Sequence, residues 1–132
     1  MIRHIKLRGW DYLRKEMIKP EKIGLLTVFI EETGTLGVGD ECELGDWVEY
    51  DLMQFTGETD YNNKEIYEKD ILKLETEYYG EKLIHYGVVK FECGTFIVSS
   101  KTLTDSYVTF IELKDEWKIE IVGNIYKNNV KV

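Results

Sequence analysis

The stretch that decides the fold is DILKLETEYYGEKLIHYGVVKFECGTFIVS, residues 70–99. Apolar and polar residues alternate along three segments of it, 70–79, 83–92 and 95–99. Alternation with a period of two is typical of β-strands that are buried on one face. Gly80-Glu81 and Cys93-Gly94 separate the segments, and glycine favours tight reversals at such positions. The stretch therefore predicts three antiparallel strands joined by two hairpins.

Two further strands are predicted at 107–113 and 117–126, linked by a charged turn at 114–116. Five strands at hairpin spacing predict a meander that curls into a small, SH3-like antiparallel barrel over residues 61–132. Alternation also predicts strands at 3–10, 25–31 and 47–54, so the N-terminal part is β-rich as well. Residues 11–22 fit either a helical turn or a charged hairpin. The glycines between 34 and 39 predict a flexible loop, and residues 56–63 predict a polar connector.

Composition supports a mainly β fold with at most short helices. The chain of 132 residues contains no alanine, the best helix former, whereas Val, Ile, Thr and the aromatic residues together number 50. These residue types pack well on a pleated sheet and lose rotamer freedom in a helix. The length suits a single domain over 1–132, with an N-terminal subdomain over 1–60 as the alternative.

The net charge of −8 is distributed unevenly along the chain. Residues 1–22 carry a balance of +4, residues 23–60 carry ten acids and no base, and residues 61–132 carry −2. An acidic protein repels the phosphates of nucleic acids, which argues against non-specific binding to them. The basic and acidic blocks can instead meet head to tail between two copies of the chain, which predicts a homo-oligomer.

Several other classes of protein lack support in the sequence. We find no apolar stretch of membrane-spanning length and no secretory signal, and two cysteines make no disulfide framework, so we expect a cytoplasmic protein. The acidic cluster at 40–46 lacks the spacing of a calcium loop, and Cys42, Cys93, His4 and His85 lack that of a zinc site. No nucleotide-binding or nucleophile motif is present. We therefore expect no metal, no cofactor and no enzymatic activity.

Three segments together carry a family resemblance. They are KLRGWD at 6–11, LMQFTG at 52–57 continuing into DYNNKEIYEKDI at 60–71, and VGNIYKN at 122–128. In these the chain resembles the YopX protein family, small proteins encoded by phages and prophages of bacteria. The resemblance implies a β-rich fold with a barrel-like C-terminal half and self-association. It implies no biochemical activity and no catalytic residues.

The chain departs from the family pattern at two positions where members usually have glycine. Asn63 stands at one of them, and asparagine tolerates a left-handed backbone well. Lys69 stands at the other. If the backbone there is left-handed, lysine costs about 1 kcal/mol relative to glycine. Gly9 replaces a common alanine, a milder change.

The family segments supply the candidate binding residues, and for both main groups a structural interpretation stands beside the functional one. The loop 60–70 is either a recognition loop or a set of Asx turns anchored to the core, and turn chemistry favours the second. Arg8, Trp10 and Asp11 form either a recognition patch, with Asp11 orienting the Arg8 guanidinium, or a buried tryptophan with a covering ion pair, which we favour. The full set of candidates is Arg8, Trp10, Asp11, Gln54, Thr56, Gly57, Asp60, Asn62, Lys64, Glu65, Tyr67, Asp70, Gly123, Asn124 and Tyr126.

These observations favour a phage or prophage accessory protein that acts as a non-enzymatic, self-associating interaction module. Further partners would be a host or phage protein. One alternative is a regulator that binds DNA or RNA through the basic N-terminus, with Arg3, Lys6 and Arg8 contacting phosphates. The other is an acidic protein that binds a basic host protein, in which case the acidic block at 23–60 is the contact surface.

Overall fold

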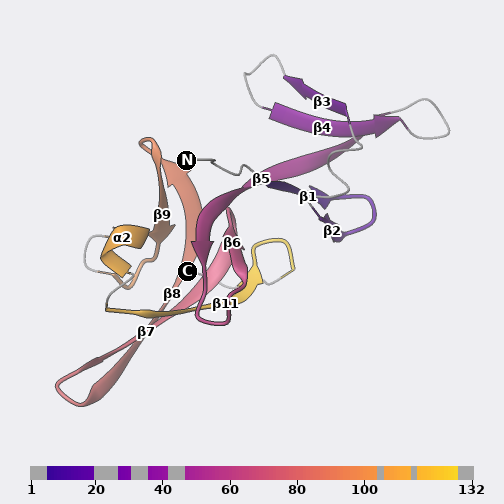
Figure 1. Cartoon of the computed structure of the whole chain (residues 1–132). Coiled ribbons are helices and arrows are strands. Elements are labelled where there is room, and N and C mark those ends of the chain that lie inside the picture. The colour runs from indigo at the N-terminus through magenta and orange to yellow at the C-terminus, as the bar shows by residue number, and fades with distance from the viewer. Residues whose placement is uncertain are drawn as a thin grey trace. The chain divides into compact units, whose positions relative to one another are not determined.

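The computed structural model has a mainly β fold made of antiparallel sheets, as the sequence predicts (Figure 1). It describes residues 6–19, 27–30, 36–41, 47–103, 106–113 and 116–127, with the backbone alone for 27–30, 36–41 and 47–50. The chain divides into two compact units, Met1–Phe55 and Thr56–Val132. Each unit contains antiparallel strands that pair in the order given below.

The first unit holds strands that pair in the order β2-β1-β5-β4-β3. Their bounds are Leu7–Asp11 for β1, Glu16–Ile18 for β2, Thr27–Ile30 for β3, Leu36–Glu41 for β4 and Trp47–Thr59 for β5. β1 and β2 form a hairpin, so the charged-hairpin alternative holds for the described part of 11–22. The flexible loop predicted at 34–39 is wrong from residue 36 onward, because β4 pairs with β3 on one side and β5 on the other. Backbone pairing on both edges holds a strand even where glycine replaces larger side chains.

Strand β5 runs from the first unit into the second and is longer than the sequence predicts. It continues to Thr59, so the predicted polar connector over 56–63 is wrong in its first half. The extension is held by a short strand, β6 (Glu65–Tyr67), which pairs with β5. The Thr56 hydroxyl supports this pairing by donating a hydrogen bond of 2.8 Å to the Ile66 carbonyl oxygen.

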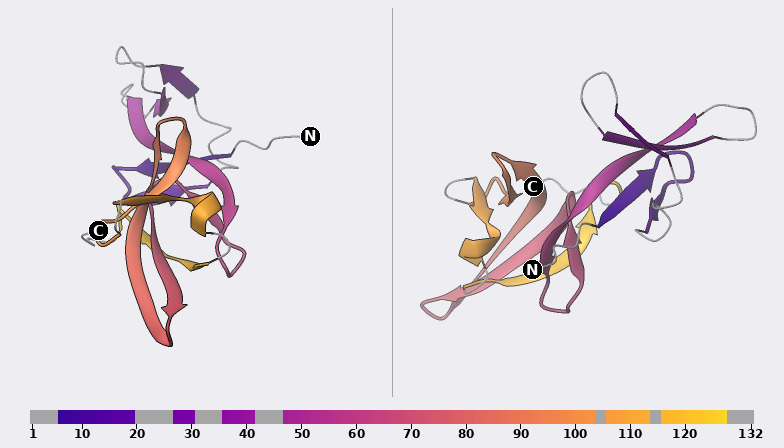
Figure 2. Two further views of the ribbon diagram at one scale, coloured as in Figure 1. Left: turned by 90° about the vertical axis from the view of Figure 1, so that its left-hand side faces the viewer. Right: turned by 45° about the horizontal axis from the view of Figure 1, so that its top comes forward.

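The second unit contains a curved, half-barrel-like sheet with the strand order β10-β9-β8-β7-β11 (Figure 2). The bounds are Asp70–Tyr78 for β7, Glu81–Glu92 for β8, Thr95–Ser99 for β9, Tyr107–Thr109 for β10 and Lys118–Asn124 for β11. The three strands predicted from residues 70–99 and the reversal at Cys93-Gly94 are confirmed. The first reversal lies one residue earlier than predicted, at Tyr79-Gly80, where both residues have positive φ. After β10 the chain returns to the far side of the sheet, where β11 pairs with β7.

The strand predicted over 107–113 is wrong in its second half. β10 ends at Thr109, and the short helix α2 follows over Phe110–Leu113. The Thr109 hydroxyl accepts a hydrogen bond from the Glu112 amide at 3.4 Å, which is the capping arrangement of a helix start. Phe110 and Leu113 are both buried and stand three residues apart, which is helical spacing.

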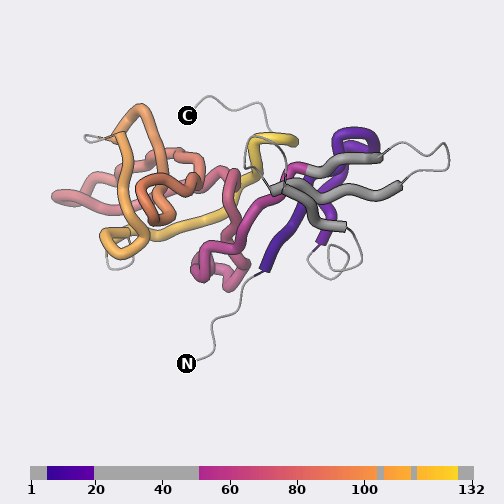
Figure 3. The backbone as a smooth tube through the Cα atoms, turned by 90° about the horizontal axis from the view of Figure 1, so that it is seen from above, coloured from indigo at the N-terminus to yellow at the C-terminus, as the bar shows by residue number. Residues whose placement is uncertain are grey.

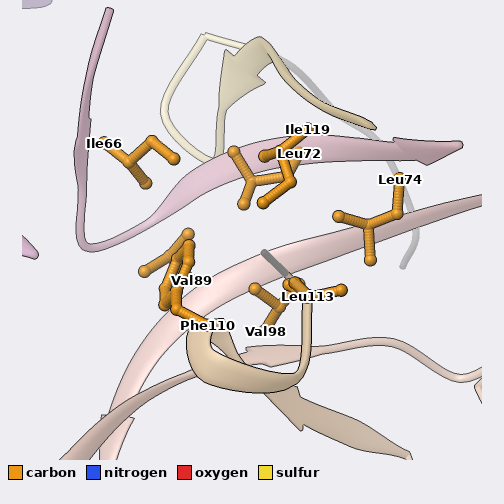
Figure 4. Close-up of a cluster of buried hydrophobic side chains, with 8 residues drawn as sticks. All are labelled: Ile66, Leu72, Leu74, Val89, Val98, Phe110, Leu113 and Ile119. Carbon is orange, nitrogen blue, oxygen red and sulfur yellow. The ribbon is translucent and has the colours of Figure 1, made fainter. Parts of the chain in front are cut away.

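The main core of the second unit lies between its sheet and α2 (Figure 4). It contains fully or nearly fully buried side chains from five strands and the helix, namely Ile66, Leu72, Leu74, Val89, Val98, Phe110, Leu113 and Ile119. Phe110 and Leu113 of α2 point toward the side chains of the strands in this view. Burial of this apolar surface at roughly 25 cal/mol per Å² supplies the main stabilisation of the unit.

Candidate functional site

Asp60 is the centre of the loop that follows β5. Its side chain is only 4% exposed. One carboxylate oxygen, Oδ1, accepts hydrogen bonds of 2.9 Å from the amides of Asn62 and Lys64. The other, Oδ2, accepts a bond of 3.1 Å from the Ile121 amide in β11. The loop also meets β11 through its backbone, since the Tyr61 amide donates to the Ile119 carbonyl oxygen at 2.9 Å.

This loop therefore covers the outer edge of β11, which is an edge strand of the sheet. An uncovered edge presents unpaired backbone groups that can pair with another chain. The Asp60 carboxylate and the Tyr61 amide satisfy one donor and one acceptor on that edge. The side chains of Asn62 and Lys64 are exposed and take part in the loop through their amides.

A second polar turn joins β6 to β7. The Asp70 carboxylate is buried and accepts a hydrogen bond of 2.8 Å from the Tyr67 amide. Lys69, within this turn, has a φ of 67°, and Asn63 in the preceding loop has a φ of 63°. Both positions where the family usually has glycine are thus left-handed, as the departures from the family pattern suggest. The strain expected at Lys69 is therefore present in the fold.

The C-terminal family segment also builds a turn. The Asn124 side-chain oxygen accepts hydrogen bonds from the amides of Tyr126, at 3.0 Å, and Lys127, at 3.1 Å. Gly123 pairs with Ile71 just after an irregularity in the β11 ladder. The Lys69 ammonium donates to the Tyr126 hydroxyl at 3.0 Å, which joins this turn to the one before β7.

The remaining candidates lie on β1 and β5. Trp10 and Asp11 are buried, with Asp11 only 1% exposed. Asp11 Oδ1 accepts bonds from the amides of Leu13 and Arg14, at 2.9 and 3.0 Å, and shapes the turn between β1 and β2. The Arg14 guanidinium forms an ion pair with Asp11, with Nε 4.0 Å from Oδ2. Arg8 and Gln54 are half-buried on their strands.

The candidates divide between the two units. The first unit contains Arg8, Trp10, Asp11 and Gln54, and the second unit contains the other eleven. Gly57, with a φ of 86°, and the half-buried Glu65 complete the set. Four of the polar candidates in the second unit act through side-chain hydrogen bonds in turns or at a strand edge: Thr56, Asp60, Asp70 and Asn124. This geometry supports the structural interpretation of loop 60–70.

The structure also contains a cavity that sequence reasoning missed. Its volume is about 450 Å³, and it lies between the turn before β7, the end of β8 and the residue after β11. Its lining combines apolar and charged residues, namely Glu68, Lys69, Val88, Val89, Lys90, Phe91, Glu92 and Ile125. The Lys69 amide crosses one side of it to reach the Val89 carbonyl oxygen at 2.8 Å. Glu68 and Lys69 belong to the family segment 60–71, whereas the other lining residues carry no sequence signal of a site.

A group of exposed apolar side chains lies along the β7–β8 hairpin of the second unit. Its turn stands at the outer end of the sheet in each view (Figure 3). Tyr79 is 90% exposed, and its ring contacts that of Tyr78 edge to face at 4.4 Å. Leu83, Ile84 and Tyr86 on β8 are exposed as well. This exposure has no signal in the sequence, because alternation alone does not show where a neighbouring strand ends.

Other features of the described residues bear on ligands and membranes. Within the described ranges, no group of three His, Cys, Asp or Glu side chains is placed to hold a metal ion. Cys93 is exposed, whereas Cys42 and His4 lie outside the described residues. No helix in the described part of the chain is long and apolar enough to span a membrane.

Comparison with known proteins settles the family. The YopX protein family matches residues 6–131, which is nearly the whole chain. The chain belongs to the YopX family. No curated protein sequence matches it.

Two solved structures share the fold of this YopX family member. Protein EF1440 from Enterococcus faecalis is 21% identical, with 96% of each chain covered and a TM-score of 0.61. Protein yopX from Bacillus subtilis is 20% identical, with 96% of this chain and 97% of the other covered and a TM-score of 0.61. At this level of identity the likeness concerns the fold alone.

Proposed function

We propose that this YopX family protein is a non-enzymatic interaction module that self-associates, and that it serves as an accessory protein of a phage or prophage in the bacterial cytoplasm. The observation that carries the proposal is the exposed apolar surface of the β7–β8 hairpin. Here this surface is called the hairpin surface and comprises Tyr78, Tyr79, Leu83, Ile84 and Tyr86.

The hairpin surface has the chemistry of a protein contact. The pairing register places Ile84 and Tyr86 on one face of the hairpin, and Tyr78 and Leu83 on the other. Groups of exposed apolar residues mark interaction sites more often than isolated ones do. Tyrosine is enriched at interfaces, because it offers a large rigid contact area and a polar tip. Three of the five residues are tyrosines, and two of these, Tyr78 and Tyr79, occupy adjacent positions at the turn.

The charges near the hairpin turn favour a protein partner over a nucleic acid. Between residues 75 and 82 the chain carries Glu75, Glu77 and Glu81 against a single Lys82. Phosphates would be repelled by this balance, whereas an apolar contact between proteins tolerates it at the rim. The hairpin surface thus supports self-association more than the alternative of a DNA- or RNA-binding regulator.

The turns built by the family segments fit this division of roles. Asp60, Asp70 and Asn124 direct their carboxylate or amide oxygens at backbone amides of their own loops and of β11. They hold the sheet that presents the hairpin. We place no catalytic step on them.

The proposal is tested by measuring the mass of the full chain with size-exclusion chromatography and light scattering, at low and at high salt. An apolar contact predicts a dimer or larger oligomer that persists at high salt, whereas a head-to-tail contact of the basic and acidic blocks weakens with salt. A monomer under both conditions would refute the proposal.

A pair of variants locates the contact. Tyr86→Thr removes an exposed ring from the hairpin surface and keeps a good β-former. We expect it to weaken association about tenfold or more, as loss of an aromatic anchor does. Ile111→Thr is the matched control, since Ile111 is 83% exposed on α2, away from the hairpin. Equal effects of both variants would count against the hairpin surface.

A further inference from the structure

Among the described residues, strand β8 has an open backbone edge from Lys82 to Tyr86. The geometry of its two hairpins shows which backbone groups lie on that edge. The β7–β8 turn consists of two residues, Tyr79 and Gly80, with φ of 51° and 79°. In a two-residue hairpin of this kind the closing pair, here Tyr78 and Glu81, exchanges backbone hydrogen bonds. Residues of β8 that form backbone hydrogen bonds with β7 then recur at every second position. The odd-numbered residues 81–87 of β8 therefore direct their backbone groups at β7.

The β8–β9 hairpin independently gives the same alternation of backbone direction along β8. Cys93 and Gly94 have φ of 52° and 79°, and the closing pair is Glu92 and Thr95. The even-numbered residues 88–92 thus direct their backbone groups at β9. Pairing with β9 ends at Val88 and Ser99. The even-numbered residues that precede Val88 point to the same side, beyond the end of β9.

Three residues form this open edge: Lys82, Ile84 and Tyr86. Among the described residues, no strand pairs with them on the outer side, and no turn or loop bond reaches their backbone. Their N–H and C=O groups form a template for another strand. The edge of β11, by contrast, is covered by the Asp60 loop.

We propose that this edge pairs with the β8 edge of a second copy, antiparallel, about a two-fold axis at Ile84. The inference rests on the proposed self-association and names its interface. Ile84 then faces Ile84 of the other copy, and Lys82 faces Tyr86 in both directions. This register uses all three outward residues of both strands, whereas any shift leaves at least one of them without a partner.

Side-chain chemistry suits a second copy at this register. Ile84 packs against its own equivalent, and the Lys82 ammonium meets the ring of Tyr86 from the other copy, a favourable cation–π pair. The charge of Lys82 is also compensated within its own hairpin, since its Nζ lies 3.1 Å from Glu75 Oε1. A register centred on Lys82 would instead place two lysines opposite each other, which is destabilising.

A proline substitution tests the edge without breaking the hairpin. Ile84 directs its N–H outward, so Ile84→Pro removes a donor that β7 does not use, as edge prolines do in natural sheets. We expect Ile84→Pro to raise the dimer dissociation constant at least about a hundredfold. Ile84→Thr keeps the N–H and serves as the matched control, with a much smaller effect. Exchange protection of the Leu83 and His85 amides, which bond to β7, reports that the hairpin is intact.

Cross-linking tests the register. In a background of Cys42→Ser and Cys93→Asn, Ile84→Cys should form a disulfide-linked homodimer, because directly opposed Cα atoms in a bonded pair lie about 5.5 Å apart. The Lys82→Cys chain alone should form no disulfide-linked homodimer. A mixture of Lys82→Cys and Tyr86→Cys chains should form a disulfide-linked mixed dimer. A Lys82→Cys homodimer would overturn the register.

The outcomes separate the two proposals. A dimer with an intact hairpin that Ile84→Pro leaves unchanged would overturn the β8 edge as the interface and leave self-association standing. A chain that stays monomeric at all concentrations would overturn both self-association and the pairing of the β8 edge with a second copy.

Discussion

Replacing Asp60 by alanine should destabilise the second unit more than its position in a surface loop suggests. Its carboxylate accepts hydrogen bonds from three amides, those of Asn62, Lys64 and Ile121. Loss of the acceptor leaves the half-buried Ile121 amide unpaired, at a cost of about 2 kcal/mol. The two loop amides can reach water, and each costs about 1 kcal/mol. We expect the free energy of unfolding to fall by about 4 kcal/mol in total.

The assay is urea unfolding followed by tryptophan fluorescence, with amide hydrogen exchange as a local readout. Asn62→Ala is the matched control, because the Asn62 side chain is exposed and the residue contributes to the loop through its amide. It should change stability by less than about 0.5 kcal/mol. In Asp60→Ala the Ile121 amide should lose its exchange protection. A loss below about 1 kcal/mol, or an Ile121 amide that stays protected, would refute the reasoning.

Three further predictions concern strain, packing and charge. Lys69→Gly should be about 1 kcal/mol more stable than Lys69→Ala in urea unfolding, because both remove the ammonium and only glycine relieves the left-handed strain; equal stabilities would contradict this. Gly87→Ala should destabilise the fold by about 1–3 kcal/mol, since its Cβ would lie 2.5 Å from Val98 Cγ1; an unchanged urea midpoint would contradict the packing. The hydrogen bond from the Lys82 ammonium lowers the pKa of Glu75 below its ordinary value of 4.5, so the stability from this pair is present above that value and is lost as the pH falls through the lowered pKa. Lys82→Gln should raise the pKa of Glu75 in an NMR titration, and an unmoved pKa would argue against the pair.

The sequence predicts the strands and turns that depend on residues close together in the chain. Alternation over residues 70–99 places β7, β8 and β9, because one face of each strand must be apolar where it meets the core. Turn chemistry likewise predicts the loop at Asp60, and the glycines usual in the family indicate the left-handed backbone at Asn63 and Lys69. These features depend on neighbours within a few residues.

The features that sequence reasoning missed depend on distant parts of the chain. Phe110 and Leu113 fit a strand by composition, and the core they share with Leu74 and Val98 makes a helical turn the better arrangement. The second contact of Asp60, with Ile121, joins residues 61 positions apart and has no local signal. The open edge of β8 likewise depends on where β9 ends, which the hydrophobic pattern does not encode.

The central claim, that the chain associates through the β8 edge, is tested most directly by the mass of the Ile84→Pro variant beside Ile84→Thr in light scattering at matched concentration. A dimer for Ile84→Thr and a folded monomer for Ile84→Pro are the predicted results. A dimer of unchanged stability for Ile84→Pro would contradict the claim.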